Sequence, residues 1–288
     1  MRYAKGHGTG NDFIIVPDLD DQLELGADVV RALCDRHAGI GADGVLRVVR
    51  TASGPAPWLM DYRNSDGSVA EMCGNGIRVY ARYLLDHGLA DGPEVAIVTR
   101  SGVRTVLQEA DGQLTVDMGP ASVGRAAWAL IAGRRYTGLA VSVGNPHLVC
   151  MIAKPLADID LSGPPEVDPD VFPAGVNVEL ARTRGDHVLQ MRVHERGSGE
   201  TLSCGTGAVA AAVAAAAAAG EWPATGDVSW TVDVPGGRLT VAPSTTASLL
   251  TGPAVIVAEG ETSSDWLADP VVTDPVVTDA AVTAPVTA

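Results

Sequence analysis

The sequence has few basic residues and no apolar segment at its N-terminus. Its 20 Lys and Arg residues against 35 Asp and Glu residues give a formal net charge of −15. A protein this acidic binds nucleic acids and anionic membrane surfaces poorly. The first residues also lack the apolar stretch that a secretory signal requires. We therefore expect no nucleic-acid or membrane partner, and we expect a cytoplasmic protein.

Paired cysteines are also absent, because the four cysteines stand far apart and form no Cys-x-x-Cys sequence. This spacing argues against a zinc site or a disulfide framework, so we expect no metal. Cys34 lies in a segment with helical spacing and Cys150 in an apolar strand. Both are predicted to be core residues, since free cysteine is among the most buried residue types. Cys73 and Cys204 stand in a different sequence context.

The sequence around Cys73, residues 64–78, is nearly repeated around Cys204, residues 195–207. In both places a Cys-Gly-x-Gly turn follows an extended apolar segment and opens a helical run, residues 77–85 and 208–219. Each cysteine is therefore predicted to lie at a helix N-terminus. Unpaired backbone N–H groups and the helix dipole favour an anion there, so each thiol is expected to be partly ionised.

Other parts of the chain repeat in the same order. Gly10-Asn11-Asp12-Phe13 corresponds to Gly144-Asn145-Pro146-His147, residues 38–43 correspond to 174–179, and the strand starting at Met60 corresponds to the strand starting at Met191. Short strands separated by Gly and Asp turns indicate antiparallel sheets. We predict an α+β fold of two pseudo-symmetric domains, each a curved, mostly antiparallel, barrel-like sheet around the central helix that begins at its cysteine.

The domain limits follow from this repeat. The first domain is expected to span residues 1–118, completed by a strand returning near residues 253–260, and the second is expected to span residues 119–252. Residues 262–288 repeat a five-residue unit with Pro, Val, Thr and Asp. This acidic segment is predicted to be a disordered tail. The apolar run at residues 208–219 is too short to cross a membrane, which needs about 20 residues.

Several separated motifs closely resemble those of the diaminopimelate epimerase family, in the same order and across about residues 1–261. They are the sequences at residues 8–13, 64–68, 72–78, 144–147, 195–197 and 204–207. The resemblance implies an active site in the cleft between two barrel-like domains. It also implies interconversion of LL- and meso-diaminopimelate, without pyridoxal phosphate or any other cofactor, in lysine and peptidoglycan precursor biosynthesis.

The chemistry of such a reaction fits the two cysteines. Inverting an α-carbon requires a base on one face and an acid on the other, so a Cys73/Cys204 pair holding one thiolate and one thiol is sufficient. The expected donors to the substrate α-carboxylate are four backbone N–H groups at the helix N-termini, those of Gly74, Asn75, Gly205 and Thr206.

The resemblance also implies the rest of the site. Arg196 is expected to bind the distal carboxylate of the substrate, and His147 and Glu195 are expected to adjust the protonation of the thiols. The loop at residues 41–44 lacks a glutamine that is found in many members of the family. The side chains expected to line the cleft are Asn11, Asn64, Asn145, Asn177, Glu195 and Arg196.

Two other functions fit parts of the sequence. One is another two-cysteine racemase or epimerase, of the proline racemase type, which would share the mechanism but not the site for a distal carboxylate. The other is a cysteine hydrolase with Cys73 as nucleophile and His147 as base, which leaves Cys204 without a role. A homodimer is compatible with all of these.

Overall fold

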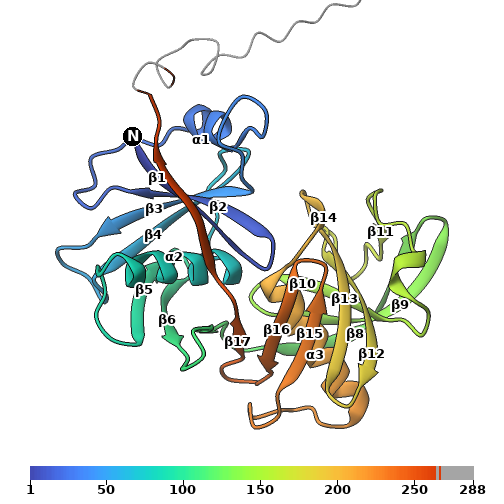
Figure 1. Cartoon of the computed structure of the whole chain (residues 1–288). Helices are drawn as coiled ribbons and strands as arrows, with labels where there is room; N and C mark the ends of the chain where they lie inside the picture. The colour runs from blue at the N-terminus through green and yellow to red at the C-terminus, as the bar shows by residue number, and fades with distance from the viewer. Residues whose placement is uncertain (264–265, 267–288) are drawn as a thin grey trace, which may run out of the picture.

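The computed structural model of the chain describes residues 1–263 and residue 266. Most of the predicted disordered tail, residues 264–265 and 267–288, lies outside the described residues. Two lobes lie side by side, an N-terminal lobe and a C-terminal lobe (Figure 1). In the described part of the chain, no helix is long and apolar enough to span a membrane.

The N-terminal lobe is built mainly from the first part of the chain. Its elements are β1 (Arg2–Gly8), β2 (Asn11–Pro17), α1 (Ala27–Cys34), β3 (Gly44–Arg50), β4 (Trp58–Asn64), α2 (Gly74–Asp86), β5 (Glu94–Thr99), β6 (Gly102–Gln108) and β7 (Leu114–Asp117). The last strand, β18 (Val255–Glu261), returns to this lobe and pairs antiparallel with β1.

The C-terminal lobe contains the remaining elements. They are β8 (Ser122–Ile131), β9 (Arg134–Ser142), β10 (Pro146–Met151), a 3-10 turn η1 (Leu156–Asp158), β11 (Glu166–Val167), β12 (Asn177–Gly185), β13 (Val188–Glu195), β14 (Gly199–Thr201), α3 (Gly205–Ala219), β15 (Trp230–Val234), β16 (Gly237–Ala242) and β17 (Leu249–Gly252).

Strand pairing follows the same scheme in both lobes. In the first, the order is β18-β1-β2-β3-β4-β5-β6-β7, with β2–β3 and β4–β5 parallel and the other pairs antiparallel. In the second, the order is β8-β9-β10-β12-β13-β15-β16-β17, with β10–β12 and β13–β15 parallel. The pair β7–β17 joins the two sheets. The predicted repeat is therefore present in the strand order.

One helix lies against each sheet. Helix α2 buries most of its residues, including Ile77, Tyr80 and Leu84, in a core with Phe13 and other sheet residues. Helix α3 is almost wholly Ala and Val, and its buried residues extend to Ala216. Such thin side chains let strands pack on all sides of the helix, as contacts with β9, β10, β12, β13, β15 and β16 show.

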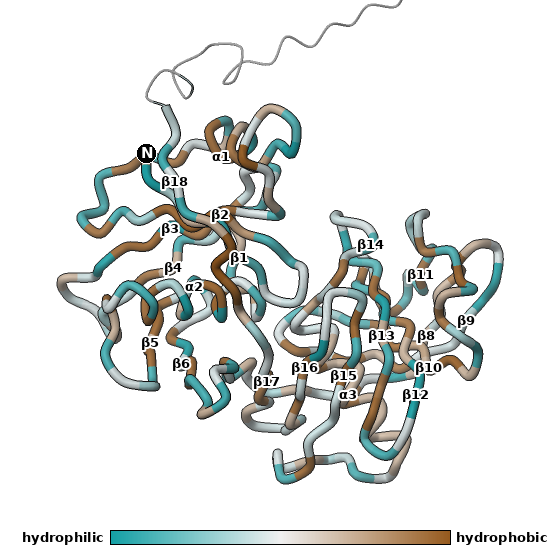
Figure 2. Tube along the Cα trace, in the orientation of Figure 1, coloured by the Kyte–Doolittle hydropathy of each residue, from teal (hydrophilic) through white to brown (hydrophobic). Residues whose placement is uncertain are grey.

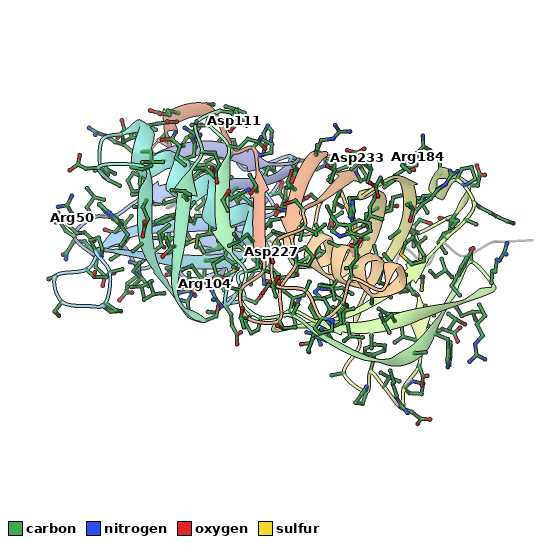
Figure 3. All side chains as sticks on the ribbon, turned by 90° about the horizontal axis from the view of Figure 1, so that it is seen from below. Arg50, Arg104, Asp111, Arg184, Asp227 and Asp233 are labelled. Carbon is green, nitrogen blue, oxygen red and sulfur yellow. The ribbon has the colours of Figure 1, made fainter. Side chains whose placement is uncertain are left out.

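Charged side chains lie mostly at the periphery of the molecule, and apolar side chains pack inside the lobes. Seen from below, the labelled side chains of Arg50, Asp111, Arg184 and Asp233 lie at the periphery, while α3 lies within its lobe (Figure 3). A smaller apolar cluster packs α1 on β2 and β3, where Figure 2 shows apolar stretches. Trp266 packs against this cluster, and the N–H of Thr262 donates to the carbonyl of Met1 at 2.9 Å.

The predicted fold class is confirmed: a mostly antiparallel α+β structure of two like halves, each with a helix that begins at a cysteine. The barrel-like description needs one correction. Among the described strands, β18 and β11 stand at opposite ends of the pairing order, so the sheet is curved but not closed.

Candidate active site

Cys73 and Cys204 are the N-cap residues of α2 and α3. Both have extended backbone angles, φ −139° and ψ 122° for Cys73 and φ −124° and ψ 118° for Cys204. Each thiol accepts a hydrogen bond at 3.4 Å from the backbone N–H three residues later, that of Gly76 or Gly207. The predicted position of each cysteine at a helix N-terminus is therefore confirmed.

The two helix N-termini meet directly at glycines. A Cβ atom on Gly205 would lie 3.3 Å from Gly74 Cα and 3.6 Å from the backbone nitrogen of Asn75. The side chain of Leu250 lies beneath both glycines, 3.1 Å from the place where either Cβ would be. Because neither glycine has a side chain, the two cysteine turns, one from each lobe, can approach each other.

The buried amide of Asn75 ties the two turns together. Its Nδ2 donates to the carbonyl oxygen of Ser203 at 3.2 Å, across the junction, and to Asn11 Oδ1 at 3.3 Å. The Cys73 thiol in turn donates to Asn11 Oδ1 at 3.6 Å, and Asn11 Nδ2 donates to Asp43 Oδ2 at 2.7 Å. Asn11 is thus held against Cys73.

A chain of polar contacts leads away from Cys204 into the C-terminal lobe. Thr206 Oγ1 lies 3.5 Å from Cys204 Sγ and accepts a hydrogen bond from Asn145 Nδ2 at 3.4 Å. Asn145 Oδ1 lies 3.0 Å from His147 Nε2, and His147 Nδ1 lies 2.6 Å from Glu179 Oε1. His147 and Glu179 are both fully buried.

Three more of the predicted residues lie at or next to the ends of β12 and β13. Glu195 accepts a hydrogen bond from the Thr201 hydroxyl, and Asn177 Oδ1 accepts from the backbone N–H of Arg196 at 2.9 Å. The Arg196 side chain is exposed and donates to the Ala174 carbonyl. Asn64 is the last residue of β4, and its Nδ2 donates to Ser68 Oγ at 3.0 Å.

Burial governs the protonation of both thiols. Desolvation raises the pKa of Cys73 to about 11, with Glu195 adding to the rise and the N–H groups of Gly76 and Asn75 opposing it. Desolvation also raises the pKa of Cys204 well above its usual value, and here the carboxyl groups of Glu195 and Glu179 both contribute. These shifts run against the expectation that helix N-termini leave the thiols partly ionised, because burial favours the neutral thiol more strongly than the N–H groups favour the anion.

The same burial acts on the two acids. Desolvation raises the pKa of Glu195, with Thr201 and Cys204 acting in the opposite direction. Desolvation also raises the pKa of Glu179, which His147 partly offsets. Burial thus favours the protonated form of both acids and of both thiols.

Several contacts were not anticipated from the sequence. Glu179 stands in the repeat opposite Asp43, and both acids contact their lobe's Asn-containing turn, Asp43 through Asn11 and Glu179 through His147. The correspondence between Asp43 and Glu179 in the repeat was the sequence signal that could have identified Glu179. Ser203, which binds both Asn75 and the Thr9 hydroxyl, carried no signal in the sequence. Cys34 and Cys150 are buried, as predicted.

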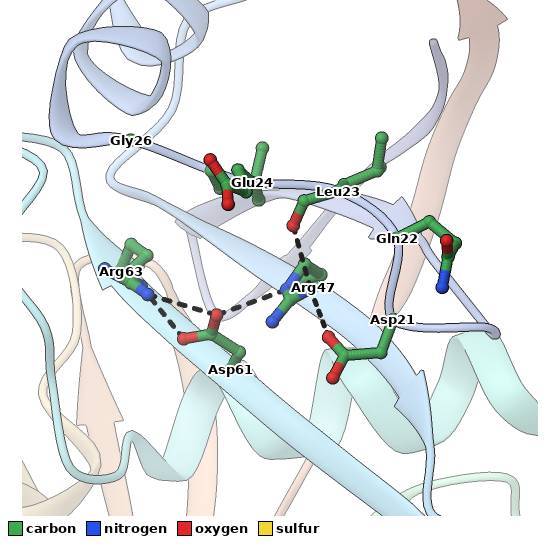
Figure 4. Close-up of a pocket in the computed structure, with 9 residues that line it drawn as sticks. Asp21, Gln22, Leu23, Glu24, Gly26, Arg47, Asp61 and Arg63 are labelled. Carbon is green, nitrogen blue, oxygen red and sulfur yellow. Dashed lines mark hydrogen bonds and ion pairs between the residues drawn. The ribbon is translucent and has the colours of Figure 1, made fainter.

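A cavity of about 500 Å³ lies elsewhere in the N-terminal lobe. Its polar lining includes Arg47, which donates to Asp61 and Asp21, and Arg63, which also donates to Asp61 (Figure 4). These charges satisfy one another, and neither cysteine is among the lining residues. Its location sets it apart from the cysteine junction.

Comparison with solved structures identifies the fold. The chain is similar to a hydroxyproline epimerase from Agrobacterium vitis, with a TM-score of 0.70 at 16% identity over 97% of this chain and 96% of that one. It is also similar to a PhzF-family phenazine biosynthesis protein from Bacillus anthracis, with a TM-score of 0.70 at 17% identity over 91% and 99%. The chain has the fold of these proteins. In this chain, each half contains one cysteine-capped helix.

Sequence comparison gives the family. The sequence model of diaminopimelate epimerase matches residues 3–124 and 139–257. The chain is 54% identical over 273 residues to the diaminopimelate epimerase of Thermobifida fusca, covering 91% of this chain and 97% of the relative. It is 50% identical to that of Streptomyces coelicolor, covering 93% and 97%. The chain belongs to the diaminopimelate epimerase family.

Proposed function

We propose that this protein interconverts LL- and meso-diaminopimelate with Cys73 and Cys204 as the base and acid of a two-base mechanism. One observation carries the proposal: two cysteine-capped helix N-termini, one from each lobe, meet at Gly74 and Gly205. A substrate carbon held at this junction has a sulfur available on each side. Membership in the diaminopimelate epimerase family agrees with this arrangement.

The reaction needs one thiolate and one thiol. The thiolate removes the α-proton from one face, and the thiol on the other face delivers its own proton to the carbanion, so the two sulfurs exchange protonation states. Negative charge that develops on the α-carboxylate is stabilised by the first N–H groups of α2 and α3, those of Gly74, Asn75, Gly205 and Thr206. Loss of one such donor typically costs about 3 kcal/mol in the transition state.

The surrounding side chains have complementary roles in this proposal. Asn11 and Asn145 hold the two turns through the contacts described above, and Glu195 with His147 sets the protonation of the thiols. Asn64 and Asn177 complete the lining of the cleft. The Arg196 side chain is exposed, so its guanidinium can exchange its hydrogen bond to the Ala174 carbonyl for one to the distal carboxylate of the substrate, a contact that a proline racemase substrate would not need.

The geometry disfavours the hydrolase alternative. A base for Cys73 must reach its thiol, but both ring nitrogens of His147 contact other groups, Asn145 Oδ1 and Glu179 Oε1. The hydrogen-bonded chain from His147 leads through Thr206 to Cys204, in the other half of the site. A Cys73–His147 pair therefore has no support in these contacts.

The test is a direct assay of the purified protein. Incubation with LL-diaminopimelate, followed by chromatographic separation of the isomers, should show meso-diaminopimelate approaching equilibrium. Cys73→Ala and Cys204→Ala should each abolish the conversion while leaving the circular dichroism spectrum unchanged. Near-normal activity in either single variant would contradict the proposal, and a wild-type protein active only on proline would favour the racemase alternative.

We extend the proposal to organisation and location. The pairing of β18 with β1 supports a first domain of residues 1–118 completed by the strand near 253–260, and a second domain of residues 119–252. All four cysteines are free, which fits a reducing compartment such as the cytoplasm. A homodimer is proposed for solution, and analytical ultracentrifugation would test it.

A further inference from the structure

Arg78 is a fully buried arginine directly behind the Cys73 turn. It lies in the second turn of α2 with no exposed surface. Its NH1 donates to the carbonyl of Gly74 at 3.0 Å, and its NH2 donates to Asn75 Oδ1 at 2.9 Å. Both acceptors belong to the first helical residues after Cys73, so the guanidinium is folded back toward the thiol-bearing end of its own helix.

Glycines make room for this side chain. Cβ atoms on Gly8 and Gly252 would each lie 3.3 Å from Arg78 NH2. Gly8 ends β1 and Gly252 ends β17, so two strands far apart in the sequence leave space at the same point. The site is shaped to hold a guanidinium, because a residue with a side chain at either position would crowd it.

The charge of Arg78 has no acidic partner. Among the residues that the structure describes, none of the ion pairs involves Arg78, and its Nε is buried without a hydrogen-bond partner. Its two acceptors, a carbonyl and an amide oxygen, are neutral. A buried charge normally requires an opposite charge nearby, since burial without one is strongly unfavourable.

The Cys73 thiol caps the same helix and can supply this charge when it ionises. Burial lowers the pKa of Arg78 to about 10, and the charge of Cys73 opposes this fall. The charged group that acts against a Cys73 anion is Glu195, while Arg78 favours the anion. Burial raises the pKa of Tyr62 well above its usual value, and the charge of Cys73 adds to this rise. The contact that favours the thiol form, to Asn11 Oδ1, is long at 3.6 Å.

The turn that carries Cys204 has no matching arginine. Five residues after Cys204, the position that corresponds to Arg78 is occupied by Val209, which is fully buried. The charged groups that act on Cys204 are the acids Glu195 and Glu179. The two cysteines thus have matched backbones and share the influence of Glu195, but a buried arginine acts on Cys73 and a second acid acts on Cys204.

We propose that Arg78 is a positioning residue, the buried counter-charge that makes Cys73 lose its proton before Cys204. The inference rests on the proposed two-base reaction and adds a direction to it. In the reactive form of the enzyme, the Cys73 thiolate accepts the α-proton and becomes a thiol. Cys204 gives its S–H proton to the opposite face and becomes the thiolate. One proton must then pass from Cys73 to Cys204, through solvent, to restore the reactive form.

The test compares single-cysteine forms of the site by thiolate ultraviolet absorbance during a pH titration. Cys204→Ala leaves Cys73, and Cys73→Ala leaves Cys204. Burial raises the pKa of both Cys34 and Cys150 to about 12, so these thiols are expected to ionise after Cys73. We expect Cys73 to titrate at a lower pH than Cys204.

Arg78 is then changed in the Cys204→Ala background. Arg78→Met should raise the midpoint of Cys73 ionisation by about one pH unit or more. At a fixed pH below both midpoints, this shift corresponds to about a tenfold smaller fraction of thiolate. Arg78→Lys keeps the charge and should restore most of this loss. Arg82→Met is the matched control, because Arg82 lies one turn further along α2 and is paired with Asp86. It should leave the titration unchanged.

Two results would overturn the inference: earlier ionisation of Cys204, or an unchanged Cys73 titration in folded Arg78→Met protein. If Arg78→Met does not fold, the order in which the two single-cysteine forms ionise tests the inference by itself. No substrate is present in these titrations. A protein that fails to epimerise diaminopimelate but ionises Cys73 first would therefore refute the proposed function and leave the role of Arg78 supported.

Discussion

Replacing Gly205 with alanine should lower kcat/KM and leave the free energy of unfolding nearly unchanged. The added Cβ would lie 3.3 Å from Gly74 Cα and 3.1 Å from the Leu250 side chain, so the two helix N-termini must separate by a few tenths of an ångström. Misplacement of reacting groups by about 1 Å costs about 100-fold in rate. A smaller displacement here should lower kcat/KM about tenfold. Alanine is the better helix former by about 1 kcal/mol, which offsets the strain in the free energy of unfolding.

The assay is the initial rate of epimerisation, with urea unfolding measured in parallel. Gly163→Ala is the control, since a Cβ there would meet no atom within 4 Å. Gly74→Ala should be milder than Gly205→Ala, because its Cβ would approach the flexible end of Met118 rather than backbone. Full activity in a normally folded Gly205→Ala variant would refute the claim that the close approach of the two turns sets the spacing of the cysteines.

Two further predictions concern charge. Asp61→Asn should lower the free energy of unfolding by about 3 kcal/mol, because the buried carboxylate accepts from Arg47, Arg63 and Arg100. Burial raises the pKa of Asp61, but hydrogen bonds from Arg63 and Arg100 outweigh it and hold that pKa below its usual value. The difference in urea unfolding should therefore shrink below about pH 4, and a constant difference would argue against the ion pairs. Since burial raises the pKa of Cys73 to about 11, kcat/KM should rise from neutral toward alkaline pH, and a fall over that range would contradict this protonation state.

The sequence was informative wherever local structure decides the outcome. A cysteine followed by Gly-x-Gly and an apolar helical run identifies an N-cap, because capping depends on a few neighbouring residues. The repeated motifs predicted two similar halves, and the two halves do pair their strands in the same order. The same reasoning drew attention to Cys73 and Cys204, whereas Asn11 and Asn145 were expected from the resemblance to the family.

Features that depend on long-range packing could not be predicted in this way. The direction of the thiol pKa shifts depends on burial at a junction between turns 131 positions apart in sequence and on carboxyl groups contributed by other strands. Arg78 follows the Cys-Gly-x-Gly turn, yet a charged helical residue is usually exposed. Its burial depends on Gly8 and Gly252, neither of which is near it in sequence.

The most direct test of the two-base account is the isotope content of the products in D₂O early in the reaction. LL-diaminopimelate should yield meso-diaminopimelate that carries deuterium at the inverted carbon from the first turnovers, while the remaining LL substrate stays unlabelled. This result follows because the proton removed by one sulfur is not the one delivered by the other. Product that retains the substrate-derived proton would show a single base acting on both faces, and it would contradict the paired roles of Cys73 and Cys204.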